Sequence, residues 1–95
     1  MTTTWTVTRS SHRGEQTIIG LGDNPGHARG LLTAAAAALI ARAGDDEWPR
    51  YTLLLGADIA AILQTGDDHH GRPDHAGTAE LLGCIHHSSP NPFTP

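Results

Sequence analysis

The chain is short, weakly hydrophobic and acidic: it has 95 residues, of which 38% are hydrophobic and 4% aromatic, and a formal net charge of −4. This length predicts one domain over residues 1–87, with a modest core that association with another chain would help to stabilise. The sequence has no apolar stretch long enough for a transmembrane helix, no signal peptide and no cluster of basic residues, so neither membrane insertion nor direct nucleic-acid binding is expected. One cysteine, Cys84, excludes an internal disulfide, and these features together predict a cytoplasmic protein.

The first predicted element is a strand over residues 3–9, in which threonines alternate with larger side chains. Threonine, tryptophan and valine favour a half-buried pleated surface, and the alternation directs Trp5 and Val7 towards the core. We expect this threonine-rich strand to lie at an exposed edge of a sheet, where it could pair with a second copy or with a partner strand.

The second predicted strand, residues 16–21, follows a polar loop over residues 10–15 whose glycine favours a hairpin. The alternation in this strand directs Ile19 and Leu21 into the core. Ile18 would then point to the opposite side of the sheet.

The longest predicted element is a helix over residues 25–43. Asn24 is a suitable N-cap, Pro25 is tolerated at the first helical position, and Gly44 lies where helices commonly end. Alanine favours the helix and lets it approach a sheet closely, because it has little bulk. The apolar residues that recur at helical spacing on one side are Ala28, Leu32, Ala35, Ala36, Leu39, Ile40 and Ala43.

An acidic connector over residues 45–49 is predicted to be solvated, although it contains Trp48. Its large ring either folds back on the core or serves as an exposed anchor for a partner, and we favour the first. The continuous apolar run over residues 51–55 predicts a strand at the centre of a sheet or covered on both faces.

The sequence of residues 57–64 is compatible with either a strand or a short helix. A Gly56-Ala57 turn would make this segment the second strand of a hairpin, whereas a cap by Asp58 would start a short helix. We favour the hairpin, because the segment is short for a helix between two glycines.

The C-terminal part is predicted to contain a long mobile loop over residues 65–77 and a short helix over residues 79–86 that Thr78 caps. The tail, residues 88–95, has three prolines and is expected to be disordered.

This order of elements predicts an α+β fold: a small β-β-α-β-β sandwich, with a mainly antiparallel sheet, one long helix on one face and a short C-terminal helix. The long helix connects the strands predicted at 16–21 and 51–55. These two strands are therefore expected to run parallel to each other.

A glycine-rich turn, residues 20–26, joins a predicted strand to a predicted helix and is a candidate phosphate or nucleotide site. The dinucleotide fingerprint requires a different glycine spacing, and the turn lacks the lysine of a P-loop. The pattern therefore favours a tight turn that starts a helix.

Histidine and aspartate are concentrated in residues 67–87, and both are ligands of divalent metals such as zinc or nickel. The candidate ligands are His69, His70, His75, His86 and His87. The same histidines would gain positive charge near pH 6, so a metal-sensing or pH-sensing segment is an alternative to a solvated loop.

Cys84 lies close in sequence to His86 and His87, and a thiol beside an imidazole is the minimum for nucleophilic catalysis. We expect this cysteine to be a small buried apolar residue instead, because no third orienting group accompanies it.

The modest core and the acidic charge favour a small binding or regulatory module over an enzyme. We expect it to act through protein–protein association, either with a second copy or with a basic partner protein. Trp5 and Trp48 are the candidate partner-binding residues.

Overall fold

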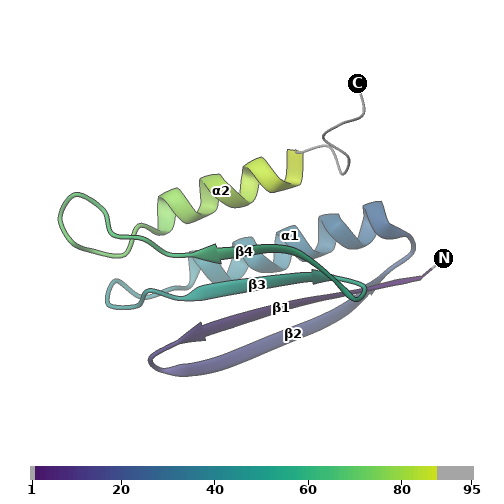
Figure 1. Cartoon of the computed structure of the whole chain (residues 1–95), viewed down its shortest axis with the longest axis horizontal. Helices are drawn as coiled ribbons and strands as arrows, with labels where there is room; N and C mark the ends of the chain where they lie inside the picture. The colour runs from purple at the N-terminus through teal and green to yellow at the C-terminus, as the bar shows by residue number, and fades with distance from the viewer. Residues whose placement is uncertain (1, 88–95) are drawn as a thin grey trace.

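The structure is a computed structural model that describes residues 2–87, and the predicted tail lies outside this range. Its elements are β1 (Thr3–Ser11), β2 (Gly14–Gly22), α1 (Pro25–Ala41), β3 (Arg50–Leu55), β4 (Asp58–Gln64) and α2 (His75–His87). They form an α+β fold, as the sequence predicted (Figure 1). Among the described residues, neither helix is long and apolar enough to cross a membrane.

The four strands form one sheet in the order β2-β1-β3-β4, and every neighbouring pair is antiparallel. It follows that β2 and β3 run parallel, as expected, with β1 between them. The prediction of β1 as an edge strand was wrong, because β3 occupies its second side. The edges of the sheet are β2 and β4 instead.

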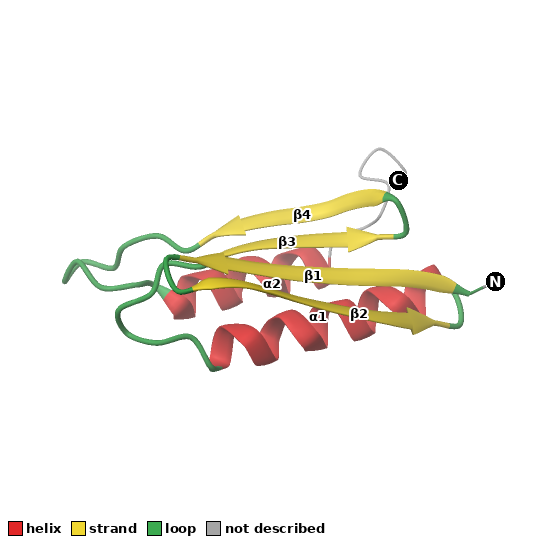
Figure 2. Ribbon diagram, turned by 90° about the horizontal axis from the view of Figure 1, so that it is seen from below, coloured by secondary structure: helices red, strands yellow, loops and turns green. Residues whose placement is uncertain are grey.

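Both helices lie against the same face of the sheet (Figure 2). Helix α1 contacts β1, β2 and β3, and α2 contacts α1 and β4. The core between the helices and the sheet is formed by Trp5, Val7, Ala28, Leu32, Ala36, Leu39, Ile40, Tyr51, Leu53, Leu63 and Leu82. Trp5 and Val7 therefore point inward as predicted.

The prediction for β2 was wrong: Ile19 and Leu21 point away from the core. Residues directly opposite in a sheet share a face, and β1 places Trp5 opposite Gly20 and Val7 opposite Ile18. The side of β2 that faces the helices is thus formed by Ile18, Gly20 and Gly22. A Cβ atom on Gly20 would collide with the Trp5 ring, so only glycine leaves room for that ring.

Helix α1 begins as predicted, because the Asn24 side chain accepts a hydrogen bond of 2.9 Å from the backbone amide of His27 and Pro25 follows the cap. It ends at Ala41, two residues before the predicted end. The amides of Arg42 and Ala43 bond to carbonyls only three residues back, which tightens the last turn.

Residues 57–64 form the second strand of a hairpin, as favoured from the sequence. Gly56 has a φ of 64°, the left-handed conformation that glycine adopts without strain. The hairpin also contains an irregularity between Leu53 and Leu54, where β4 has one residue more than β3.

Helix α2 begins three residues before the predicted cap. Asp74 is the capping residue: its carboxylate accepts from the Gly77 amide at 2.9 Å, whereas Thr78 is buried within the helix and donates its hydroxyl to the Asp74 carbonyl. The loop before it is shorter than predicted and has a defined hydrogen-bonded shape. The carboxylate of Asp68 accepts from the amides of His70 and Arg72, and these two bonds lower the pKa of Asp68, that from Arg72 more than that from His70.

Candidate functional site

The candidate site is the face of the sheet that neither helix covers, called the open face below (Figure 2). It consists of the alternate residues of the four strands that point away from the core. The register aligns them in rows across the sheet. One row is Ile19, Thr6, Leu54 and Ile59, and the next is Thr17, Thr8, Thr52 and Ile62.

Large aliphatic side chains protrude from both edge strands of the open face. The exposed fractions are 67% for Ile19 and 63% for Leu21 on β2, and 63% for Ile59 and 47% for Ile62 on β4. Isolated exposed aliphatic residues are ordinary in proteins, but several on one flat surface commonly mark an interaction site.

The two central strands of the open face carry mostly threonine. Thr4, Thr6 and Thr8 of β1 alternate with the buried side of that strand, and Thr8 lies across from Thr17, with their hydroxyl oxygens 3.1 Å apart. Threonine carries a methyl group beside its hydroxyl group, and the Thr8–Thr17 pair shows that hydroxyl groups on this face can bond to one another. Covering this pair therefore leaves its hydroxyl groups bonded, and the methyl groups supply apolar contact.

Charge is confined to one end of the open face. Within the described strands, the charged side chains on this face are Glu15 and Arg50, which flank Ser10 in the last row. Solvated sheet faces usually alternate with polar and charged side chains, and edge strands usually carry charges that prevent association. In the described strands, the middle of the open face has neither charged side chains on its surface nor charges on its edge strands.

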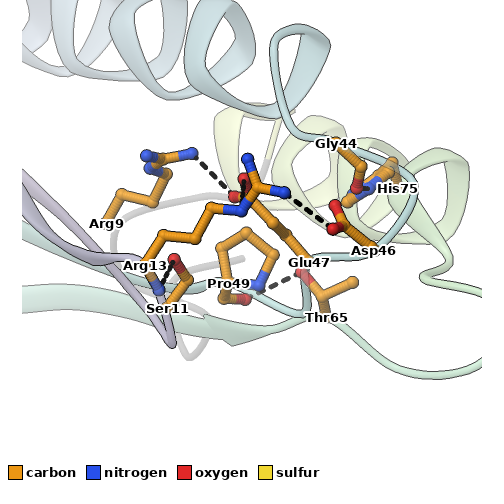
Figure 3. A network of polar contacts seen from close by, with 9 residues as sticks. All are labelled: Arg9, Ser11, Arg13, Gly44, Asp46, Glu47, Pro49, Thr65 and His75. Carbon is orange, nitrogen blue, oxygen red and sulfur yellow. Dashed lines mark hydrogen bonds and ion pairs between the residues drawn. The ribbon is translucent and has the colours of Figure 1, made fainter.

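A polar network closes the end of the core beside the β1–β2 turn (Figure 3). Glu47 is buried and pairs with Arg9 at 3.1 Å and with Arg13 at 3.4 Å, while Arg13 also pairs with Asp46 at 2.7 Å. The sequence had predicted a solvated acidic connector, which is wrong for Glu47. Its burial is possible because two guanidinium groups from the first hairpin lie against its carboxylate.

Tyr51 lies next to this network, opposite Arg9 in the sheet, and its side chain is fully buried. Burial raises the pKa of Tyr51; the Arg9 guanidinium opposes this effect, and the Glu47 carboxylate adds to it. His75 connects α2 to the same connector, because its Nε2 atom lies 2.8 Å from the Gly44 carbonyl oxygen. These contacts join the first hairpin, the segment between α1 and β3, and the start of α2, and none of them involves a side chain of the open face.

The two tryptophans occupy different environments. Trp5 is buried in the core, so it offers a partner little surface. Trp48 is 39% exposed, and its indole nitrogen donates a hydrogen bond of 2.6 Å to the Asp67 carboxylate. This bond connects the segment before β3 to the loop after β4 and leaves part of the Trp48 ring in solvent.

The candidate metal ligands do not converge among the residues described. The rings of His69 and His70 contact each other at a tilt of 43°, with centroids 4.0 Å apart, whereas His75 is bonded to the Gly44 carbonyl. No group of three histidine, cysteine, aspartate or glutamate side chains in the described part of the chain could hold a metal ion. The side chains of His86 and His87 lie outside that part, so a site that includes them stays a prediction.

The glycine-rich turn has structural roles in this fold. A Cβ atom on Gly22 would collide with Ala28, which shows that α1 packs directly on the end of β2. The His27 amide is bonded to Asn24, and the His27 ring accepts from the Asp23 amide at 2.9 Å. These bonds use groups that a bound phosphate would need.

Cys84 is exposed on α2, contrary to the expectation of a small buried residue. The sequence suggested His86 and His87 as the imidazole partners of this thiol, and the side chains of both lie outside the described part. The structure therefore gives no geometry for a thiol–imidazole pair.

Comparison of the chain with protein-family models, with characterised proteins and with solved structures found no match.

Proposed function

We propose that the chain is a small association module whose binding surface is the open face. The observation that carries this proposal is the combination of exposed Ile19, Leu21, Ile59 and Ile62 with an uncharged, threonine-rich centre. These side chains are about half exposed, so covering one of them contributes about 1–2 kcal/mol, and a partner sheet or a flat protein surface that covers all four would gain binding free energy.

The chemistry of the open face favours a protein partner over the other classes of ligand. Surfaces that bind single-stranded nucleic acid combine stacking aromatic rings with positive charge, whereas within the described strands this face carries no aromatic ring and one arginine, Arg50. The chain as a whole has a net charge of −4, which disfavours contact with phosphate backbones.

A regulatory role in the cytoplasm is the biological setting that we propose for this association. The single cysteine agrees with that location, because structural disulfides are rare in the reducing cytoplasm. Partial exposure of the Trp48 ring supports a second, smaller contact point at the end of the molecule.

The proposal is tested with three baits: the wild-type chain, the Ile19→Arg variant and the Ala37→Arg variant. Ile19 is exposed on the open face, and Ala37 is exposed on α1, so both substitutions add one positive charge without filling the core. Each bait is immobilised without a histidine tag and exposed to native host extract, and captured proteins are quantified by mass spectrometry.

The expected result is one stoichiometric protein, either another protein or the chain itself, that wild type and Ala37→Arg capture and Ile19→Arg loses. Burying an unpaired arginine in the interface explains the loss. Equal capture by all three baits would reject the open face as the binding surface. Capture by none of them, in a chain that is also monomeric, would reject the association function.

A further inference from the structure

Resting on the proposed function, we propose that the occupant of the open face is a second copy of this chain. The two copies pack sheet against sheet and leave their helices on the outside, so the dimer has four layers. Sheets that pack in this way lie about 10 Å apart, with the side chains of both inner faces forming a new core.

Charge is the first argument for a second copy. Two identical surfaces repel each other when they carry net charge, and this chain has a net charge of −4. The middle of the open face is neutral, and its two charged side chains, Glu15 and Arg50, have opposite signs. A basic partner would find no acidic cluster on this face, whereas a second copy meets a neutral surface like its own.

The distribution of large and small side chains is the second argument. A two-fold axis that runs along the strands, between β1 and β3, places each β1 over the β3 of the other copy and each β2 over the other β4. Each row of one copy then faces the same row of the second copy, with the order of the four strands reversed. Leu54 lies over Thr6 of the second copy and Ile62 lies over its Thr17, so in these pairs a large residue meets a small one and the two can interdigitate. Ile19 lies over Ile59 of the second copy, which adds an aliphatic contact at each side of the interface.

The area of the open face is the third argument. Four strands about 4.8 Å apart, over about seven residues of about 3.3 Å each, cover roughly 450 Å² in projection. Burying this area on both copies removes roughly 900 Å² or more, which is less than the area of a stable interface and within the range of weak, transient ones. The structure therefore supports a dimer that exchanges with monomer.

The test is sedimentation velocity of the wild type, Ile19→Arg and Ala37→Arg over concentrations of about 5 to 500 μM. Wild type and Ala37→Arg are expected to shift from monomer to dimer within this range. Ile19→Arg is expected to associate at least about a hundredfold more weakly, because each dimer would bury two unpaired charges. Circular dichroism of the three proteins shows whether each is folded.

A wild-type chain that stays monomeric throughout this range would overturn the dimer, and so would an Ile19→Arg variant that still dimerises as the wild type does. If a different protein is captured by the wild-type bait and lost by the Ile19→Arg bait, the association function survives and only the identity of the occupant is wrong. A monomeric chain that captures nothing would overturn both proposals.

Discussion

The contact between Trp5 and Gly20 shows how one residue determines the packing of two strands. The tryptophan ring occupies the position of a Cβ atom on the opposite strand, and glycine at position 20 leaves that space free. A glycine inside a strand is otherwise unfavourable, so its presence here reflects the close approach of the ring. Nothing in the local sequence of β2 reveals this requirement, since the ring belongs to another strand.

We expect Gly20→Ala to lower the free energy of unfolding by about 1–3 kcal/mol, because the added methyl group forces the buried Trp5 ring to move. Gly30→Ala is the matched control. Gly30 lies in α1 with open space around it, so that variant should gain up to about 1 kcal/mol from the higher helix propensity of alanine. Urea unfolding followed by tryptophan fluorescence measures both, and a Gly20→Ala variant as stable as wild type would contradict the packing.

Tyr51 leads to a second prediction, which concerns how the stability of the fold depends on pH. Because burial raises its pKa, the folded state holds the phenolic proton more tightly than the unfolded state does. The resulting contribution to stability is complete below the ordinary pKa of 10.0 and is lost as the pH rises through the pKa of the folded state.

Tyr51 is the only tyrosine in the chain, so the phenolate absorbance reports on it alone. A spectrophotometric titration of the native protein should show ionisation above the pKa measured for the same chain in denaturant. Ionisation at the same pH in both conditions would contradict its burial.

Secondary-structure elements were predictable where their signals are local. The Asn24-Pro25 start of α1 and the Gly56-Ala57 hairpin depend on neighbouring residues, and both are present in the structure. The inward side of β2 depends on a partner strand. The predicted six-residue loop left the register open, whereas the observed two-residue turn at His12 and Arg13 places Trp5 opposite Gly20.

The candidate site was only partly predictable for the same reason. Thr4, Thr6 and Thr8 were recognisable as one side of a strand, but their place in the middle of a sheet depends on β3. Ile19 was assigned to the core because it alternates with Leu21 on one side of the predicted strand, and the sequence alone could not show which side faces the helices. Glu47 was assigned to solvent, since its arginine partners lie more than thirty residues away in the sequence.

The N-terminal cap of α2, formed by Asp74, can be tested by substitution. Asp74→Ala should lower the free energy of unfolding by about 1 kcal/mol, because the Gly77 amide loses its acceptor at the helix terminus. Asp74→Asn keeps an oxygen at this position and should remain close to wild type. Thermal unfolding by circular dichroism compares the two, and equal losses would show that the charge of Asp74 matters more than the cap.

The whole molecule has two layers, and its open face leaves a large part of the sheet without a second layer. A chain of this size buries only about two thirds of the surface of its unfolded state, so its core provides a limited margin of stability. The core is small for a further reason: two of the five buried residues of α1 are alanines, Ala28 and Ala36, which let the helix approach the sheet but bury little area. A second copy on the open face would supply the missing hydrophobic contact.

The prediction at this scale concerns the dependence of Tm on protein concentration. If folding and dimerisation are coupled, mass action stabilises the native state, and the Tm of the wild type should rise with protein concentration. The Tm of Ile19→Arg should stay constant, since its interface is disrupted while its core is unchanged. Differential scanning calorimetry at several concentrations measures both, with Ala37→Arg expected to follow the wild type. A wild-type Tm that stays constant while sedimentation shows dimer would contradict the coupling between dimerisation and folding.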